Sequence, residues 1–129
     1  MSFVQHLKVM IVDDHRTSRM LTYEALTALG IKQVVYAGDG EEALKMMMTQ
    51  PCHIVISDYN MPKLDGIQLL KALRSYGPTQ KTPFIMLTGK GDRALVQQAA
   101  AAGANNILAK PVSVPVLRKS LEAVLGRLQ

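Results

Sequence analysis

Five short apolar blocks recur along the chain, separated by more polar segments. Each block has the length and the nearly continuous apolar character of a strand that is buried on both faces of a sheet. The blocks lie at Lys8–Val12, Gln33–Ala37, 54–58, 83–87 and Asn106–Ala109. The third block differs from the others because its apolar run, 54–56, leads into an acid, Asp58. We therefore predict five buried strands, of which the third ends in a carboxylate.

Between the first three blocks, apolar residues recur every three or four positions, which is the period of a helix. Thr17 or Ser18 is suited to cap the first such helix and Gly30 to end it. Its expected core-facing residues are Met20, Leu21, Ala25, Leu26 and Leu29. Before the second helix, Asp39 and Glu42 have the spacing of a capping box. Its expected core-facing residues are Ala43, Leu44, Met47 and Met48.

Three further helices are predicted in the second half of the chain. One follows Pro62, one covers Arg93–Ala102 behind the cap residue Asp92, and one covers 113–125, with Leu128 continuing its apolar stripe. Strands and helices thus alternate with short loops, which predicts an α/β fold with a five-stranded parallel sheet and helices on both faces. The sequence has no repeat and no linker, so we expect a single domain over residues 1–129 without an effector domain.

Composition narrows the class of protein. Apolar residues make up 48% of the 129 residues, which suits a packed core and excludes a disordered chain. No apolar run has the length of a membrane span, and the N-terminus lacks the pattern of a signal peptide. The single cysteine, Cys52, excludes a disulfide framework and a cysteine zinc site. We expect a cytoplasmic protein without membrane contact.

The formal net charge is +5, which raises the question of nucleic-acid binding. The basic residues are scattered, and only Arg118 and Lys119 are adjacent in the sequence. There is no basic run and no interleaved series of aromatic residues. We therefore favour a basic face toward an acidic protein partner over a nucleic-acid surface.

Carboxylates follow two of the predicted strands. Asp13 and Asp14 come directly after the first strand, and Asp58 ends the third. These strands are neighbours in a doubly wound sheet, so the three carboxylates should converge where such sheets bind ligands. Close carboxylates repel one another and raise each other's pKa values, and a divalent cation relieves that repulsion. The oxygen ligands predict a Mg²⁺ site.

Two more groups are expected at the same edge of the sheet. Thr88 follows the fourth strand and Lys110 follows the fifth. A hydroxyl, an ammonium and a metal around one carboxylate are the components of a phosphoryl-acceptor site. We predict Asp58 as the nucleophile. Lys110 and Mg²⁺ would neutralise the incoming charge, and Thr88 would bind a phosphoryl oxygen.

With these residues in place, the chain resembles a response-regulator receiver domain over nearly its whole length. The matching residues are Asp13, Asp14, Asp58 with the Tyr-Asn-Met-Pro that follows it, Asp65, Gly66, Thr88, Lys110 and Pro111. The resemblance implies a flavodoxin-like sheet with the strand order 2-1-3-4-5, which is known for this family.

The resemblance also implies a chemistry. A sensor histidine kinase would pass a phosphoryl group from its phosphohistidine to Asp58. Mg²⁺ would be held by Asp14, Asp58 and the backbone carbonyl of Asn60, with Asp13 assisting through water. In this family the bond corresponding to Lys110–Pro111 is usually cis, a geometry that peptides adopt readily only before proline.

Among receiver domains, the chain most resembles stand-alone chemotaxis regulators of the CheY type. This implies a monomer that accepts phosphate from a kinase and acts on a flagellar motor switch protein or another output protein, with a phosphatase as a further partner. Such a protein is a regulator rather than an enzyme, and at most catalyses its own phosphorylation and dephosphorylation. The alternative role is a phosphate sink or phosphorelay intermediate without motor output.

One switch residue departs from the family pattern. Phosphorylation is expected to draw Thr88 toward Asp58 and so to change the face formed by the fourth helix, the fifth strand and the fifth helix. Receiver domains often carry Tyr or Phe three residues before the lysine, where this chain has Ile107. We expect the link through Thr88 to persist without aromatic gating at Ile107.

Other functions fit the residues less well. A Mg²⁺-dependent aspartyl-phosphate phosphatase typically needs a second acid two residues after its nucleophile, where this chain has Asn60. A flavin or nucleotide binder would meet the repulsion of Asp13 and Asp14 at the loop that should bind phosphate. For His15, the sequence favours a solvated loop histidine over a metal ligand.

Overall fold

The computed structural model describes residues 3–89 and 93–126. Five strands form its sheet: β1 (Lys8–Val12), β2 (Gln33–Ala37), β3 (Ile54–Asp58), β4 (Phe84–Thr88) and β5 (Asn106–Ala109). The α-helices are α1 (Arg16–Ala28), α2 (Gly40–Thr49), α3 (Gly66–Ser75), α4 (Arg93–Ala102) and α5 (Val114–Leu125). Short 3₁₀ turns lie at Phe3–Gln5 and Gly77–Thr79. The predicted alternation of strands and helices is confirmed.

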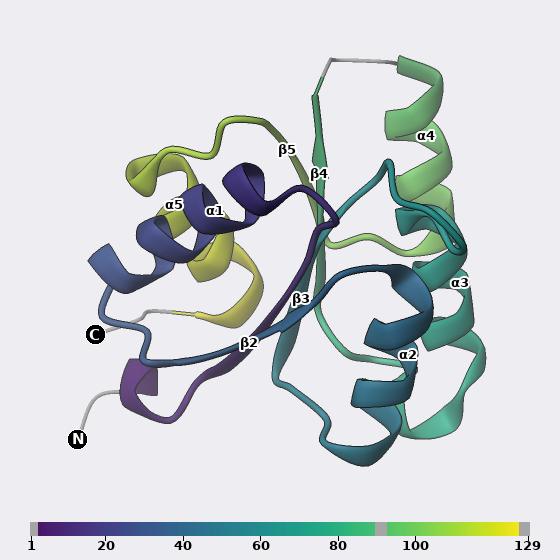
Figure 1. The fold of residues 1–129 in the computed structure, drawn as a ribbon, viewed down its shortest axis with the longest axis horizontal. Helices are drawn as coiled ribbons and strands as arrows, with labels where there is room; N and C mark the ends of the chain where they lie inside the picture. The colour runs from purple at the N-terminus through teal and green to yellow at the C-terminus, as the bar shows by residue number, and fades with distance from the viewer. Residues whose placement is uncertain (1–2, 90–92, 127–129) are drawn as a thin grey trace.

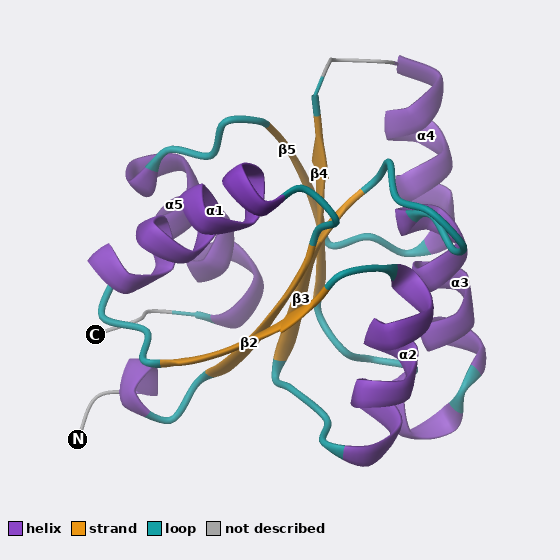
Figure 2. Cartoon of the chain, in the orientation of Figure 1, coloured by secondary structure: helices purple, strands orange, loops and turns teal. Residues whose placement is uncertain are grey.

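The five strands form one parallel sheet in the order β2-β1-β3-β4-β5, as the family resemblance implied. Helices α1 and α5 cover one face of the sheet, and α2, α3 and α4 cover the other (Figure 1). The strand ends that precede α1, α3 and α5 lie at a common edge of the sheet (Figure 2). None of the described helices is both long and apolar enough to cross a bilayer.

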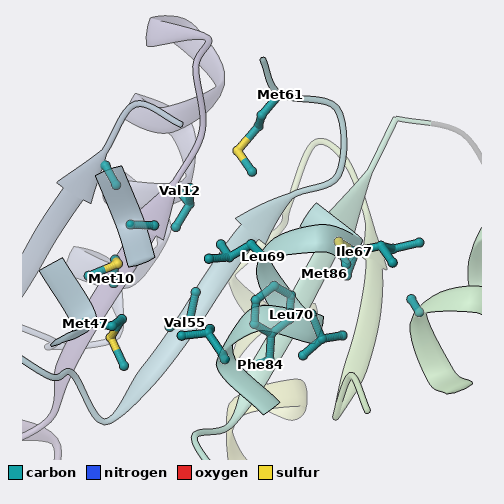
Figure 3. Packing of buried hydrophobic residues seen from close by; sticks show 14 of the residues in the cluster. Met10, Val12, Met47, Val55, Met61, Ile67, Leu69, Leu70, Phe84 and Met86 are labelled. Carbon is teal, nitrogen blue, oxygen red and sulfur yellow. The ribbon is translucent and has the colours of Figure 1, made fainter. Parts of the chain in front are cut away.

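Alternate residues of each central strand supply two separate hydrophobic clusters. From β1, Met10 and Val12 point into the cluster beneath α2, α3 and α4, and Val9 and Ile11 point into the cluster beneath α1 and α5. Figure 3 shows the first cluster, in which Phe84 of β4 packs among the residues of α3. The central strands are buried on both faces, and their sequences are accordingly apolar except near their carboxyl ends, where Ser57, Asp58 and Thr88 lie.

The sequence placed two helices correctly but misjudged part of their faces. Helix α1 begins at Arg16, with His15 as its N-cap residue, so the predicted caps Thr17 and Ser18 are wrong. Ala25 and Leu26 are buried as predicted. Met20 and Leu21 are 47% and 45% exposed, because α1 turns Thr22 toward the core together with Ala25 and Leu26. In α2, Met48 is also exposed rather than buried.

The capping residues were predicted in part. The Asp39 side chain accepts a hydrogen bond from the backbone N–H of Glu42, as expected for the cap of α2. The Glu42 carboxylate accepts from the N–H of Gly38 rather than from Asp39, so the reciprocal half of the predicted box is displaced by one residue. The predicted roles of Asp92 and Leu128 lie outside the described residues.

Candidate functional site

The sheet register brings four strand ends together. Val12 pairs with Ser57, Asp58 with Leu87, and Thr88 with Ala109, so the ends of β1, β3, β4 and β5 are adjacent. The backbone N–H of Lys110 donates to the carbonyl of Thr88 at 2.9 Å, which continues this alignment one residue past β5. The predicted site residues therefore share one edge of the sheet.

The acids converge as predicted. Asp13, Asp14 and Asp58 each place a carboxylate oxygen in a group whose potential ligand atoms all lie within 4.8 Å of one another. The same group includes His15, whose Nδ1 lies 3.1 Å from Asp14 Oδ1. The sequence had favoured a solvated loop histidine. The side chain is indeed 66% exposed, but it faces the acids.

Lys110 bridges the two buried acids. Its Nζ lies 3.0 Å from Asp58 Oδ2 and 3.3 Å from Asp13 Oδ2. The Lys110–Pro111 peptide bond is cis, as the family resemblance implied. Lys110 therefore stands where it can neutralise negative charge that arrives at Asp58.

Asp58 is only 4% exposed at the end of β3. Burial raises the pKa of its carboxyl, the Lys110 ammonium opposes that rise, and the Asp13 carboxylate adds to it. The sequence predicted a raised pKa from repulsion among the acids. The direction is confirmed for Asp58, but burial is the larger cause.

The buried carboxylate of Asp13 has one oxygen that is poorly satisfied. Oδ1 accepts a hydrogen bond from the backbone N–H of His15 at 2.9 Å. Oδ2 is buried and accepts no hydrogen bond from the described residues, although the Lys110 ammonium stands at ion-pair distance. An under-satisfied buried oxygen beside two further carboxylates suits a hard divalent cation. The residues present therefore fit the expected metal.

The loop after β3 holds Asp58 in place. The Gly66 N–H donates to the carbonyl of Tyr59 at 2.8 Å, and Gly66 begins α3. A Cβ at Gly66 would lie 2.6 Å from the carbonyl oxygen of Asp58 and 2.6 Å from Met86 Sδ. This close approach explains the need for glycine, which the sequence alone did not reveal. Asn60 is exposed in this loop, and the role of its carbonyl as a metal ligand stays a prediction.

The two proposed switch residues lie on adjacent strands. Thr88 is buried at the end of β4, and Ile107 lies partly buried on β5, opposite Met86 in the sheet register. Ile107 packs against the cluster beneath α2, α3 and α4. The aliphatic side chain of Ile107 offers this packing contact but no polar group.

Comparison with known proteins agrees with the family resemblance of the sequence. Residues 9–122 match the family model for the response regulator receiver domain. The chain is 55% identical to a probable chemotaxis protein CheY of Rhizobium etli over 129 residues, which cover 100% of both chains.

Two solved structures are also similar. One is the chemotaxis protein CheY4 of Vibrio cholerae, with 35% identity, a TM-score of 0.84, and coverage of 92% of this chain and 98% of that one. The other is the receiver domain of a sensor histidine kinase from Pseudomonas aeruginosa, with 25% identity, a TM-score of 0.84, and coverage of 93% and 98%. That second structure is described with a magnesium ion coordinated in its active site cleft.

Proposed function

The chain belongs to the family of response regulator receiver domains, and from this premise we propose that it is a chemotaxis signalling switch that carries a phosphoryl group on Asp58. The observation that carries the proposal is the buried Asp58 carboxylate, with Lys110 at 3.0 Å and the carboxylate of Asp13 bridged by the same ammonium. Each group has a defined task in phosphoryl transfer.

An Asp58 oxygen forms the new P–O bond as the P–N bond of the donor phosphohistidine breaks, and the released imidazole takes up a proton. Lys110 neutralises charge on the Asp58 side of the transferring group. The Thr88 hydroxyl donates to a phosphoryl oxygen. Asp13, Asp14 and Asp58, with the carbonyl of Asn60, would hold Mg²⁺, which supplies positive charge to the phosphoryl oxygens.

Labelling with acetyl phosphate tests the assignment of Asp58. With Mg²⁺ present, intact-mass measurement should show one added phosphoryl group on the native chain and none on Asp58→Asn. Asp39→Asn is the matched control, because Asp39 is the N-cap residue of α2 and asparagine also caps a helix. Undiminished labelling of Asp58→Asn would remove Asp58 from the proposed role.

The partners belong to the proposal as well. The protein would act in the cytoplasm. Its phosphoryl donor is a sensor histidine kinase, and its output is a flagellar motor switch protein or another target that recognises the phosphorylated form. A phosphatase would end the signal. We propose a monomer that binds neither nucleic acid nor membrane. The chemotaxis names of the similar proteins from Rhizobium etli and Vibrio cholerae support this role.

A second role is favoured by a specific residue. Ile107 stands where many receiver domains carry an aromatic switch, so phosphorylation would reach the output face without aromatic gating. The protein would then act as a phosphate sink or relay intermediate. Trapping the phosphorylated state with beryllofluoride separates the two roles. A gain of affinity for a motor switch protein indicates signalling, whereas fast phosphate uptake from the kinase without that gain indicates a sink.

We also propose that the chain is a regulator and not an enzyme that turns over external substrates. Position 60 holds asparagine, which cannot donate and retrieve a proton for a leaving group. Incubation of the native chain with a small phosphate ester should therefore release no more phosphate than the same incubation of Asp58→Asn. Multiple turnover would favour the phosphatase instead.

A further inference from the structure

We infer that His15 is a metal ligand of this site, whose nitrogen donor raises the affinity for ions such as Co²⁺ relative to Mg²⁺. The inference rests on the proposed function only because it uses the same carboxylates. It concerns which divalent ions the site selects, and it does not require that phosphorylation occur.

The distances suit a shared ion. Two ligands at right angles about a metal, with bonds of about 2.1 Å, are about 3.0 Å apart. The Nδ1 atom of His15 lies 3.1 Å from Asp14 Oδ1 and 3.7 Å from Asp13 Oδ1. Opposite ligands with such bonds are about 4.2 Å apart. The potential ligand atoms of the group lie within 4.8 Å of one another. A small inward movement of the exposed His15 and Asp14 side chains would bring these atoms within the distance of about 4.2 Å that separates opposite ligands.

A second observation is that one buried carboxylate oxygen of this group lacks a hydrogen bond from the described residues. Asp13 Oδ2 is buried and accepts no hydrogen bond from any residue in the described ranges. Lys110 stands close to this oxygen, whereas His15 stands close to Oδ1 of the same carboxylate. The acids are therefore flanked by an ammonium near one Asp13 oxygen and by a potential nitrogen ligand near the other.

Local structure keeps His15 near the acids. It is the N-cap residue of α1, and its backbone N–H donates to Asp13 Oδ1 at 2.9 Å. Its side chain makes no capping hydrogen bond, so the imidazole is not used by the helix. A simple contact between His15 and Asp14 would also give the 3.1 Å distance, and the metal titrations below separate that contact from ligation.

The identity of the added donor determines the selectivity. Carboxylates, carbonyls and water suit Mg²⁺, whereas an imidazole nitrogen suits the later transition metals and Zn²⁺. A purely oxygen-based site discriminates less strongly in favour of those ions. His15 would therefore give this receiver site a preference that the three carboxylates do not provide by themselves.

The test uses the full, untagged chain and two metal probes. Co²⁺ binding is followed by visible absorption and by proton NMR of hyperfine-shifted imidazole signals, and Mg²⁺ binding by competition with Co²⁺. His15→Gln should weaken Co²⁺ binding at least about tenfold and Mg²⁺ binding by less than about twofold. It should also remove the shifted imidazole signals. His6→Gln, which changes an exposed histidine outside the site, should alter none of these.

Two results would overturn the inference. An equal loss of affinity for both ions would show that His15 only orients Asp14. Unchanged Co²⁺ binding, with the shifted signals absent from the native chain as well, would make His15 an ordinary surface residue. Neither result affects phosphorylation of Asp58, which acetyl phosphate labelling tests separately. Failure of that labelling would in turn leave the role of His15 intact.

Discussion

At the scale of single residues, the chemistry depends on the charge balance around Asp58. One ammonium, Lys110, lies within 3.3 Å of the carboxylates of Asp13 and Asp58. The sequence predicted these acids and Lys110 because each stands at the end of an apolar block, where a parallel sheet gathers its polar ends. For His15 it favoured a solvated loop position and did not place the side chain beside the acids, because the direction of a loop side chain depends on the folded backbone.

Removal of the ammonium should slow phosphoryl transfer. Lys110→Ala leaves the transferring group without a positive charge that the protein holds in position, and we expect labelling by acetyl phosphate to fall about a hundredfold. Rates come from intact-mass measurement over time. Lys119→Ala, at an exposed position of α5, is the control and should label like the native chain. An unchanged labelling rate in Lys110→Ala would contradict the proposal that Lys110 neutralises charge on the transferring phosphoryl group.

The raised pKa of Asp58 predicts a pH-dependent cost to stability. Burial makes the Asp58 carboxyl bind its proton more tightly in the folded state than in the unfolded chain. The free energy of unfolding therefore falls as the pH rises from the pKa of an unfolded aspartate to the raised pKa of Asp58 in the folded state. Without Mg²⁺, Asp58→Asn should therefore show a higher urea midpoint than the native chain at neutral pH. The difference should shrink in acid, where Asp58 is protonated in both states.

The control for this experiment is saturating Mg²⁺, which should stabilise the native chain more than Asp58→Asn and reduce the difference. A lower midpoint for Asp58→Asn at neutral pH without Mg²⁺ would mean that pairing with Lys110 outweighs burial.

At the scale of elements, the turn from β3 into α3 constrains the site most tightly. Gly66→Ala would place a methyl group 2.6 Å from the carbonyl oxygen of Asp58. We expect a loss of about 1–3 kcal/mol in the free energy of unfolding and slower labelling, because the loop must shift. In the matched variant Gly77→Ala, the new methyl group meets no described atom within 4 Å, and we expect less than about 0.5 kcal/mol. Equal effects in urea titrations would contradict this explanation.

For helix α1, the sequence predicts the helix but not which of its faces is buried. Its apolar residues spread over more than one face, so the period predicts a helix but not which side is buried. Packing against β1 and α5 buries Leu26 and leaves Leu21 exposed.

A matched pair of substitutions tests that assignment. Leu26→Ala should cost about 2–5 kcal/mol, because it leaves a cavity in the cluster beneath α1 and α5. Leu21→Ala should cost less than about 0.5 kcal/mol. Chemical denaturation measures both, and similar losses would show that α1 packs on a different side.

At the scale of the whole molecule, alternation of strands and helices was enough to predict a parallel sheet covered on both faces. The strand order could not come from that alternation, because several orders satisfy it, and it was supplied by the family resemblance. The convergence of the site follows from the order: β1 and β3 are neighbours, which brings Asp13 to Asp58. The fold thus brings residues that are far apart in the sequence into the proposed phosphoryl-acceptor site.

The most direct test of this account is to locate the phosphoryl group. The native chain is phosphorylated with Mg²⁺ present, the acyl phosphate is reduced with borohydride, and the modified residue is mapped by peptide mass spectrometry. We expect one modified residue, Asp58, and no modification when Mg²⁺ is withheld. Modification of another residue in place of Asp58 would contradict it.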